Sequence, residues 1–319
     1  MAELNIGIIG CGRMGRERAR CAQALGARIR IVFDPDHTRS ADLTTKYGGR
    51  VGQSVEECFH LGLDAILLCT APGTRRPAEI LCLENRVPFL VEKPVSTSAA
   101  QCRDLVERLQ QQPVINAVGY MNRYRSSVQQ AREILRHAEI IGLSAHWICK
   151  PYNVPWWKDD QYSGGPHNDQ ATHLFDLSRL LVGEITEIQA RFQGTATVAT
   201  ILRFETDAVG TTLYSCDGHS KDIGIRIFTQ RGTIALTGWD FRMTENTITA
   251  ILADACEEDI FLSETSAFFE AVHSGRKDLI QSDFLDAVRT QRVLDAARQS
   301  WECRRSVPVF PNGSLGSGA

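Results

Sequence analysis

The first part of the chain alternates short apolar runs with longer segments of helical period. The runs are rich in β-branched residues and lie at 4–9, 29–33, 65–69, 88–91 and 114–119. Amphipathic helices are expected at 13–26, 39–47, 54–60, 74–85 and 98–110. This alternation predicts an α/β fold, a Rossmann-type doubly wound parallel sheet with helices on both faces.

The pattern changes after Tyr120. A helix near 124–137, a strand at 140–149 and a helix near 166–182 are followed by strand-like runs without helices between them. These runs lie near 185–194, 197–205, 208–216, 223–229, 232–236 and 248–252. Consecutive strands pair mainly antiparallel, because parallel neighbours need a long crossover. With closing helices near 263–275 and 283–300, the pattern predicts an α+β domain on an open, mainly antiparallel sheet.

These patterns predict three parts of the chain. Residues 1–120 are expected to form a dinucleotide-binding domain, and 121–310 a domain for substrate binding and oligomerisation. Residues 311–319 are Gly/Ser-rich and are expected to be a flexible tail. A length of 319 residues agrees with two domains rather than one.

Composition narrows the class of protein. The formal net charge is −3 and no long Lys/Arg run occurs, which argues against partners such as nucleic acid or an anionic membrane. The first residues lack the features of a signal peptide, and no apolar stretch is long enough for a membrane helix. The ten cysteines are irregularly spaced, which predicts reduced thiols in a cytoplasmic protein without a structural metal site.

A glycine-rich turn follows the first apolar run. In GCGRMG, Gly10, Gly12 and Gly15 enclose Arg13 and Met14 and open a helical pattern. The first glycine allows a tight turn, the second lets the backbone approach a pyrophosphate, and the third packs the helix on the strand. The turn predicts a dinucleotide site, with phosphates at the helix N-terminus.

The end of the second run carries the signal for the type of dinucleotide. Asp34 follows Phe33 and can accept hydrogen bonds from ribose hydroxyls. Its carboxylate favours NAD, since it would repel the 2′-phosphate of NADP. Thr38, Arg39 and Ser40 could grip that phosphate if Asp34 turned away, so NADP stays open, although Arg39 also fits a solvated charge.

Two sets of polar residues could carry catalysis. Glu92, Lys93 and Pro94 end the run at 88–91, where an open α/β sheet places its ligand crevice. Asp169, His173 and Asp176 share one stripe of a predicted helix, where an imidazole beside carboxylates can exchange a proton near neutral pH. A solvated lysine and a polar helix edge are the alternative interpretations.

Together these motifs resemble the Gfo/Idh/MocA family, the glucose-fructose oxidoreductase and inositol dehydrogenase group. The resemblance covers nearly the whole chain. It is carried by the glycine turn, by Thr70-Ala-Pro72, by Glu92-Lys93-Pro94, and by Gly164-Gly165 followed by Asp169, His173 and Asp176.

The resemblance implies roles for individual residues. Lys93 would bind the reacting hydroxyl, His173 would be the main acid/base, and Asp169 would bind substrate or assist. Thr70, Pro72, Glu92 and Lys93 would line the cofactor, and the Lys93-Pro94 peptide would be cis. Relatives commonly carry a His after the Thr-x-Pro turn, where this chain has Arg75 and Arg76, and this departure puts the contacts to the nicotinamide in doubt.

Substrate contacts are expected from the second domain and its border. Tyr120 and Arg123 match an aromatic-x-x-Arg segment that faces the pocket in relatives, with Asn122 between them. Trp157, beside Trp156, could lay its ring against a sugar, or pack against the sheet. His167 replaces the apolar residue that usually follows the diglycine, and would be either a polar contact or solvated.

The combined expectation is an NAD(P)-dependent dehydrogenase that acts on a secondary alcohol of a sugar, sugar derivative or cyclitol. Two alternatives stay open. One is a reductase of an imine, enone or anhydrosugar, and the other is a dinucleotide-sensing regulator without turnover. The resemblance also implies a homodimer or homotetramer formed through the C-terminal sheet.

Overall fold

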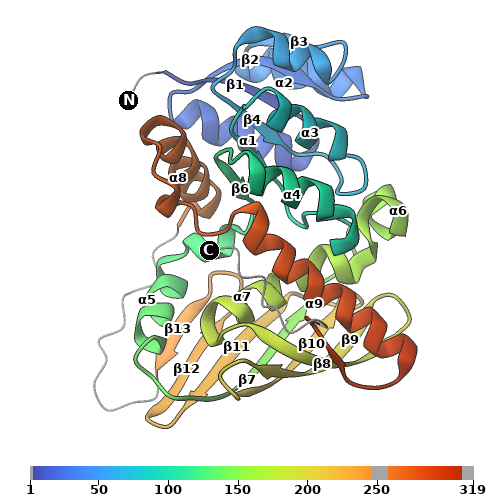
Figure 1. Cartoon of the computed structure of the whole chain (residues 1–319), viewed down its shortest axis with the longest axis vertical. Coiled ribbons are helices and arrows are strands. Elements are labelled where there is room, and N and C mark those ends of the chain that lie inside the picture. The colour runs from blue at the N-terminus through green and yellow to red at the C-terminus, as the bar shows by residue number, and fades with distance from the viewer. Residues whose placement is uncertain (1–2, 246–257, 311–319) are drawn as a thin grey trace. The chain divides into compact units, whose positions relative to one another are not determined.

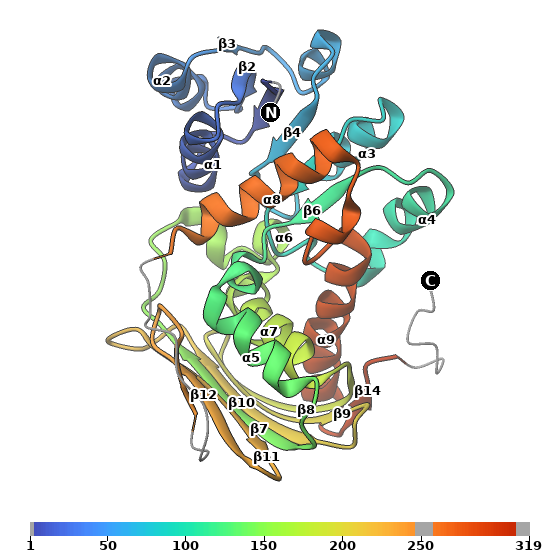
Figure 2. The ribbon, with the colours of Figure 1, turned by 90° about the vertical axis from the view of Figure 1, so that its left-hand side faces the viewer.

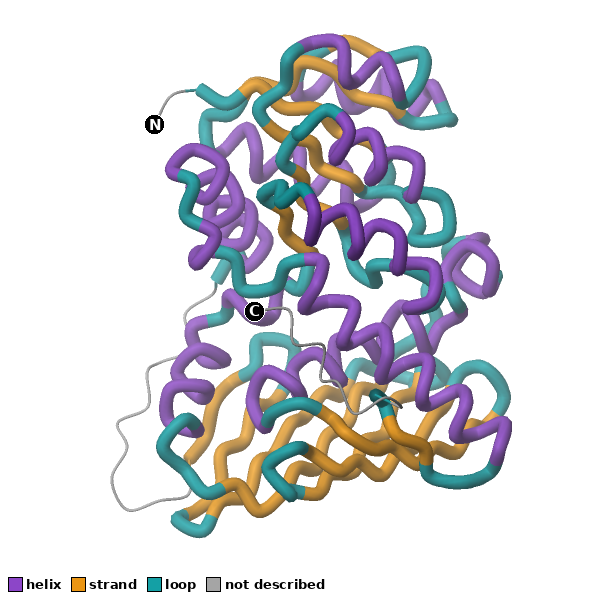
Figure 3. The backbone as a smooth tube through the Cα atoms, in the orientation of Figure 1, coloured by secondary structure: helices purple, strands orange, loops and turns teal. Residues whose placement is uncertain are grey.

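The computed structural model describes residues 3–245 and 258–310. The chain divides into two compact units, each built from two stretches of sequence. Unit 1 comprises Met1–Met121 and Asp259–Val288, and unit 2 comprises Asn122–Glu258 and Arg289–Ala319. Helices surround the sheet of unit 1, and unit 2 is built on a larger sheet (Figures 1 and 3).

Unit 1 contains a six-stranded sheet whose strands are all parallel. Its order, β3-β2-β1-β4-β5-β6, is that of a doubly wound dinucleotide fold, which confirms the predicted class. The strand β3 was not predicted, because two residues are too few to show a period. The strands are β1 (Asn5–Ile9), β2 (Arg28–Phe33), β3 (Arg50–Val51), β4 (Ala65–Leu68), β5 (Phe89–Val91) and β6 (Asn116–Val118).

The helices of unit 1 lie close to the predicted positions. The segment expected as a helix at 54–60 forms a 3₁₀ helix instead, and the segment at 98–110 begins with a 3₁₀ turn. They are α1 (Arg13–Ala24), α2 (His37–Tyr47), η1 (Glu56–Leu61), α3 (Arg76–Glu84), η2 (Ala99–Cys102), α4 (Arg103–Gln111), α8 (Ile260–Ser274) and η6 (Lys277–Leu279).

Helix α8 belongs to unit 1, whereas 121–310 as a whole was expected in the second domain. It packs against α1, and its Phe268 and Phe269 are buried in one cluster with Ile6 and Ile8 of β1. The burial of this apolar face explains the return of the chain, because each aromatic side chain removes a large apolar area from water. The pattern of a helix does not reveal which sheet it covers.

Unit 2 contains an eight-stranded sheet in the order β13-β12-β11-β7-β10-β9-β8-β14. All its pairs are antiparallel except β7 with β10, as the prediction of a mainly antiparallel sheet requires. The expected strand at 248–252 lies outside the described residues. The strands are β7 (Ile140–Ile148), β8 (Ile185–Gln193), β9 (Thr197–Phe204), β10 (Val209–Ser215), β11 (Asp222–Thr229), β12 (Gly232–Thr237), β13 (Arg242–Glu245) and β14 (Val307–Pro308).

One face of this sheet is covered and the other is open. Burial alternates strictly along β9 and β10, and α5 and α7 lie over the covered face (Figure 2). Helix α9 begins in unit 1 and ends in unit 2. The helical elements that complete the chain are η3 (Met121–Tyr124), α5 (Ser126–Leu135), η4 (Pro155–Lys158), α6 (Asp160–Ser163), η5 (His167–Ala171), α7 (Thr172–Val182) and α9 (Phe284–Cys303).

Two further features of the described residues bear on function. No helix in 3–245 or 258–310 combines the length and apolar character needed to cross a bilayer. The nine cysteines in these ranges are free thiols.

Candidate functional site

In the glycine turn of unit 1, the fold requires two of the glycines and leaves space for a ligand beside the third. Gly10 has a φ of 97°, and a Cβ there would lie 2.7 Å from the backbone of Cys69. A Cβ on Gly15 would lie 2.0 Å from the carbonyl oxygen of Gly10. A Cβ on Gly12 would meet nothing within 4 Å. The fold therefore requires Gly10 and Gly15, while the open space beside Gly12 suits the approach of a pyrophosphate.

The N-terminus of helix α1 is open to an anion. Gly12 is its N-cap, and no side chain caps the first turn. The backbone N–H groups of Arg13, Met14 and Gly15 lie in that turn, where the helix dipole favours negative charge. Arg13 is exposed and Met14 is half-buried. These residues fit the phosphates of a dinucleotide.

Asp34 closes the turn from the end of β2. One of its carboxylate oxygens accepts the N–H of Cys11 at 2.7 Å, and the other accepts the N–H of Asp36 at 2.9 Å. The carboxylate is thus fixed beside the glycine turn, with lone pairs left over for ribose hydroxyls. This orientation is the one expected for NAD.

The residues that could have held a 2′-phosphate have other contacts. Arg39 forms an ion pair with Asp36 at 3.1 Å, and about half of its side chain is exposed. The N–H of Thr38 donates to the Asp36 side chain, which caps α2. Ser40 is buried and contacts the carbonyl of Asp34. Arg39 therefore fits a first-turn surface charge.

Glu92 was predicted to line the cofactor, and in the structure its carboxylate binds the buried side chain of Arg18. Its Oε1 accepts from Nε of Arg18 at 2.8 Å. The same guanidinium donates to Glu264 at 2.5 Å and to Thr265 at 3.0 Å. Arg18 and Glu264 are fully buried, and Glu92 is nearly so. Glu92 therefore joins α1, α8 and the end of β5. Sequence reasoning missed Arg18, which reads as an ordinary polar position of a helix.

Lys93 lies two residues beyond the end of β5 and is half-buried. Its peptide bond to Pro94 is cis, as the resemblance implied. Thr70 and Pro72 follow β4, the neighbour of β5 in the sheet, and the Thr70 hydroxyl has no hydrogen-bond partner among the described residues. The ends of β1, β4 and β5 thus bring the glycine turn, Thr70 and Lys93 to one edge of the sheet.

Arg75, one of the two arginines that follow the Thr-x-Pro turn, lies inside unit 1. It is 2% exposed and donates to the backbone carbonyl of Glu92, the residue before Lys93. Burial lowers its pKa below the usual value. Arg76 contacts the buried Glu79 at 2.8 Å, and burial raises the pKa of Glu79. Arg75 therefore supports the peptide that carries Lys93.

In unit 2 the diglycine shapes the start of the helix that carries His173. Gly164 and Gly165 have φ of 74° and 82°. They precede a π-helical segment, η5, which continues into α7. The wider turn of η5 changes the angle between Asp169 and the residues that follow, so a uniform α-helical wheel does not apply. Turns of this type are frequent at functional sites.

Asp169 is held by two donors. The indole Nε1 of Trp157 donates to its carboxylate at 2.8 Å, and the amide of Gln170 donates at 2.6 Å. Trp157 is 1% exposed and packs edge-to-face with Tyr152. Of the two predictions for Trp157, contact with a sugar or packing, this burial favours packing. Its ring is in the core and its polar end positions Asp169, while Trp156 is the exposed member of the pair.

His173 stacks on an aromatic ring of the sheet. Its imidazole lies 5.1 Å from the ring of Trp147 on β7, with an interplanar angle of 12°. Both residues are buried, and the rings of Trp239 and Phe241 lie 6.4 and 6.3 Å from Trp147. Trp147 therefore limits the rotation of the imidazole. Sequence reasoning missed this residue, which reads as one more apolar position of a strand.

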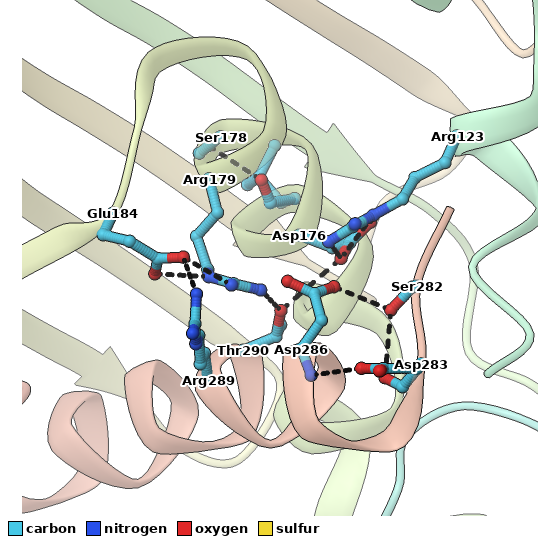
Figure 4. A network of polar contacts seen from close by, with 11 residues as sticks. Arg123, Asp176, Ser178, Arg179, Glu184, Ser282, Asp283, Asp286, Arg289 and Thr290 are labelled. Atoms are coloured by element: carbon cyan, nitrogen blue, oxygen red, sulfur yellow. Dashed lines mark hydrogen bonds and ion pairs between the residues drawn. The ribbon is translucent and has the colours of Figure 1, made fainter. Parts of the chain in front are cut away.

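Asp176 lies in an ion-pair network rather than in a simple stripe with His173. Arg123 donates to both of its oxygens, at 2.6 to 3.1 Å. Thr290 contacts Asp176 at 3.4 Å and accepts from Arg179, which pairs with Glu184 (Figure 4). Arg123 was predicted to contact the substrate, and in the structure its guanidinium binds Asp176.

Two other residues that were predicted to contact substrate or solvent are buried in the structure. Tyr120 is 1% exposed and belongs to the core cluster of unit 1. His167 is 3% exposed, so it is not solvated, and its ring packs edge-to-face with Phe175 and Phe192. Burial, aided by Arg298, lowers the pKa of His167 to about 3, so the imidazole is neutral.

One group of metal-type side chains comes together in the described part of the chain. Glu17, Cys21 and Asp259 have ligand atoms within 4.8 Å of one another in unit 1. Arg20 forms ion pairs with both carboxylates, at 2.6 and 2.7 Å. The guanidinium of Arg20 already balances the charge of these carboxylates, so the group has the character of a surface ion-pair cluster.

Comparison with known proteins agrees with this architecture. Residues 4–120 match the family described as an oxidoreductase family with an NAD-binding Rossmann fold, and residues 128–235 match the GFO/IDH/MocA C-terminal domain. The chain is 23% identical to a myo-inositol 2-dehydrogenase of Thermotoga maritima over 96% of this chain and 98% of that protein.

Other similarities are partial or structural. The match to an oxidoreductase of Streptococcus pneumoniae, at 26% identity, covers 57% of this chain and 51% of that protein. Levoglucosan dehydrogenase, solved with NADH and L-sorbose, shares the fold with a TM-score of 0.86 at 18% identity, over 97% of this chain and all of that one. With both of its domains matched and a glycine turn that fits NAD, the chain belongs to the Gfo/Idh/MocA family of oxidoreductases.

Proposed function

We propose that the protein is an NAD-dependent dehydrogenase that oxidises a secondary alcohol of a sugar, sugar derivative or cyclitol, in a reversible reaction. The observation that carries the proposal is the glycine turn, in which only Gly12 is not required by the fold. Together with the fixed Asp34, it supports a bound NAD. Several relatives named as inositol 2-dehydrogenases support the class of substrate.

The proposed division of roles follows from the two polar sets. Bound NAD supplies the hydride acceptor. His173 accepts the hydroxyl proton as the carbonyl forms, and Lys93 stabilises the negative charge that develops in the reaction. Proton transfer of this type contributes about 10² to 10⁴ in rate. Arg75 and Trp147 act as positioning residues for Lys93 and His173.

Single substitutions test these roles. Lys93→Ala and His173→Ala are each expected to lower kcat by at least a hundredfold on the true substrate, which a nicotinamide-absorbance screen of cyclitols, aldoses and sugar phosphates would identify. His137→Ala is a matched control, because His137 lies on the surface of unit 2 and is expected to leave turnover unchanged. Near-normal turnover in both folded variants would contradict the assignment.

The cofactor site can be tested without a substrate. Gly12→Ala is expected to fold normally, since its methyl group meets no protein atom, but to bind NAD at least tenfold more weakly, about 1.4 kcal/mol. Gly15→Ala is expected to disturb folding instead, because its methyl group overlaps the Gly10 carbonyl. Titration of NAD and thermal unfolding of both variants separate these effects, and unchanged NAD affinity in Gly12→Ala would count against the site.

We further propose a homo-oligomer formed through the open face of the unit 2 sheet. Ile201 of β9 and Val209 and Leu213 of β10 point to this face and are 56%, 60% and 41% exposed. An apolar patch of this kind marks an interaction surface. Leu213→Glu is expected to lower the mass measured by light scattering, and a wild-type monomer would end this part of the proposal.

A further inference from the structure

Unit 2 buries an arginine, Arg125, that has no counter-ion in contact among the residues that the structure describes. Arg125 precedes helix α5 and is 3% exposed. Among the described residues it forms no ion pair, and its Nη2 has no hydrogen-bond partner. Its Nε donates to Oδ1 of Asn122 at 3.0 Å. Buried donors nearly always have a partner, so an unpartnered guanidinium nitrogen calls for an explanation.

Asn122 adds a second unpartnered donor to the same cluster. It is 1% exposed, its Oδ1 binds Arg125, and its Nδ2 has no hydrogen-bond partner. The bond between the two side chains keeps both unpartnered nitrogens in one place. Two donors, one of them cationic, form the arrangement that recognises an oxyanion.

Two carboxylates of the described residues act on Arg125 through their charge but form no ion pair with it. Burial lowers its pKa, and Asp240 and Glu258 oppose this only through their charge. Glu258 is engaged elsewhere, because its carboxylate accepts the N–H of Ser126 at the start of α5. The N-terminus of this helix is therefore already capped, and the two unpartnered nitrogens are a separate feature.

Aromatic rings and a lysine surround the cluster. The guanidinium carbon of Arg125 lies 5.5 Å from the ring of Trp239 and 5.3 Å from that of Phe241. Nζ of Lys221 lies 3.9 Å from the ring of Trp239, which is 38% exposed. Trp239 belongs to the turn between β12 and β13, where Gly238 and Phe241 have φ of 75° and 49°. A movement of this partly exposed indole would open the cluster to solvent.

The cluster is linked to His173 through aromatic contacts. Trp147 stacks on His173 and contacts both Trp239 and Phe241, the two rings under Arg125. All these residues belong to unit 2. Two successive aromatic rings, Trp239 or Phe241 and then Trp147, therefore connect Arg125 with the imidazole that is proposed to take the substrate proton.

We propose that Asn122 and Arg125 form an oxyanion subsite, with Lys221 at its rim, which binds the carboxylate or phosphate of an anionic sugar or cyclitol. This inference rests on the proposed function, since it names the class of substrate for the same site. The bound oxyanion accepts hydrogen bonds from Nη2 of Arg125 and Nδ2 of Asn122, and supplies the counter-ion that the guanidinium lacks.

Calorimetric titration of the full chain with NAD tests the subsite. The probes are D-glucuronate and D-glucose 6-phosphate, each compared with D-glucose, which shares the ring but has no charge. We expect one of the anionic probes to bind at least tenfold more tightly than glucose, and the difference to shrink at high salt. The stronger of the two identifies a carboxylate or a phosphate. Equal affinities for all three probes would overturn the proposal.

Three variants assign the effect to the cluster. Arg125→Gln is expected to lose the tenfold preference while its affinity for glucose changes less than twofold. Asn122→Asp places an anion beside Arg125, and is expected to abolish the preference and to raise the thermal midpoint. Arg203→Gln removes an exposed arginine of β9 and is the control. A preference that survives in both folded cluster variants would contradict the subsite.

Binding and turnover are read separately, so the two proposals can fail independently. If Arg125→Gln removes anion binding but no sugar supports reduction of NAD, the subsite stands and the dehydrogenase is rejected. If neutral cyclitols are oxidised and the anionic probes show no preference, the dehydrogenase stands and the subsite is rejected.

Discussion

Arg18 is buried in unit 1 and Arg125 in unit 2, and these two arginines differ in how their charge is balanced. In unit 1, Arg18 contacts Glu92, Glu264 and Thr265. In unit 2, Arg125 contacts Asn122 and two aromatic rings, and no carboxylate within 3–245 or 258–310 forms an ion pair with it. Burial alone would lower the pKa of both. The carboxylates outweigh it for Arg18 and raise its pKa, whereas burial prevails for Arg125.

The paired charge of Arg18 stabilises the fold, whereas the charge of Arg125 is proposed to bind a ligand. Burying an ion is costly unless partners replace its hydration. Arg123, only two residues before Arg125, follows the first pattern because Asp176 binds it with both oxygens. Unit 2 can therefore supply carboxylate partners, and their absence from contact with Arg125 is specific to that position.

The largest effect is expected when the balanced arginine is removed. Arg18→Met would leave Glu92 and Glu264 buried without their cation, which costs about 3 to 5 kcal/mol of unfolding free energy. Urea denaturation measures this loss. Arg20→Met is the control, since its ion pairs are partly exposed and worth less than about 1 kcal/mol. Similar losses in the two variants would show that burial does not distinguish them.

A pH series tests another buried basic residue, His167, for which the described part of the chain supplies no carboxylate partner. Its folded pKa of about 3 lies below the ordinary value, so the unfolded state binds more protons as the pH falls. Stability is therefore full above the unfolded pKa and decreases by about 1.4 kcal/mol per pH unit between roughly pH 6 and 4. His167→Leu is expected to flatten this dependence, as followed by urea denaturation at each pH. An unchanged slope would place the acid sensitivity elsewhere.

The smallest effect is expected for the unbalanced arginine. Arg125→Gln should change the unfolding free energy by less than about 1 kcal/mol without ligand, because removing an unpaired buried charge offsets the lost contacts. The same denaturation assay measures it. A loss as large as that of Arg18→Met would mean that Arg125 is structural, and the contrast between the two units would disappear.

Local signals account for the parts of this structure that could be predicted. The glycine turn, the strand that precedes it and Asp34 lie within one strand-turn-helix-strand unit, so spacing alone identifies them. The strands of unit 2 also show their alternation in sequence, down to the exposed positions of β9 and β10.

Features that depend on distant segments could not be predicted. Trp157 and Tyr120 have the composition of a binding surface, yet both are buried, because burial depends on packing that the local pattern does not contain. The π-helical turn at 167–171 shifts Asp169 relative to a regular helix. The partners of Arg18 lie 74 and 246 residues away in the sequence, and no spacing rule connects them.

The placement of α8 has a consequence for the order in which the chain becomes structured during translation. The first 121 residues leave the ribosome without Phe268, Phe269 or the carboxylate of Glu264. Until that helix emerges, the nascent nucleotide-binding half exposes apolar surface of β1 and α1, and lacks one of the two acids that neutralise Arg18. The half that is made first is therefore completed late, and chaperones that bind nascent chains would find apolar surface on it until α8 emerges.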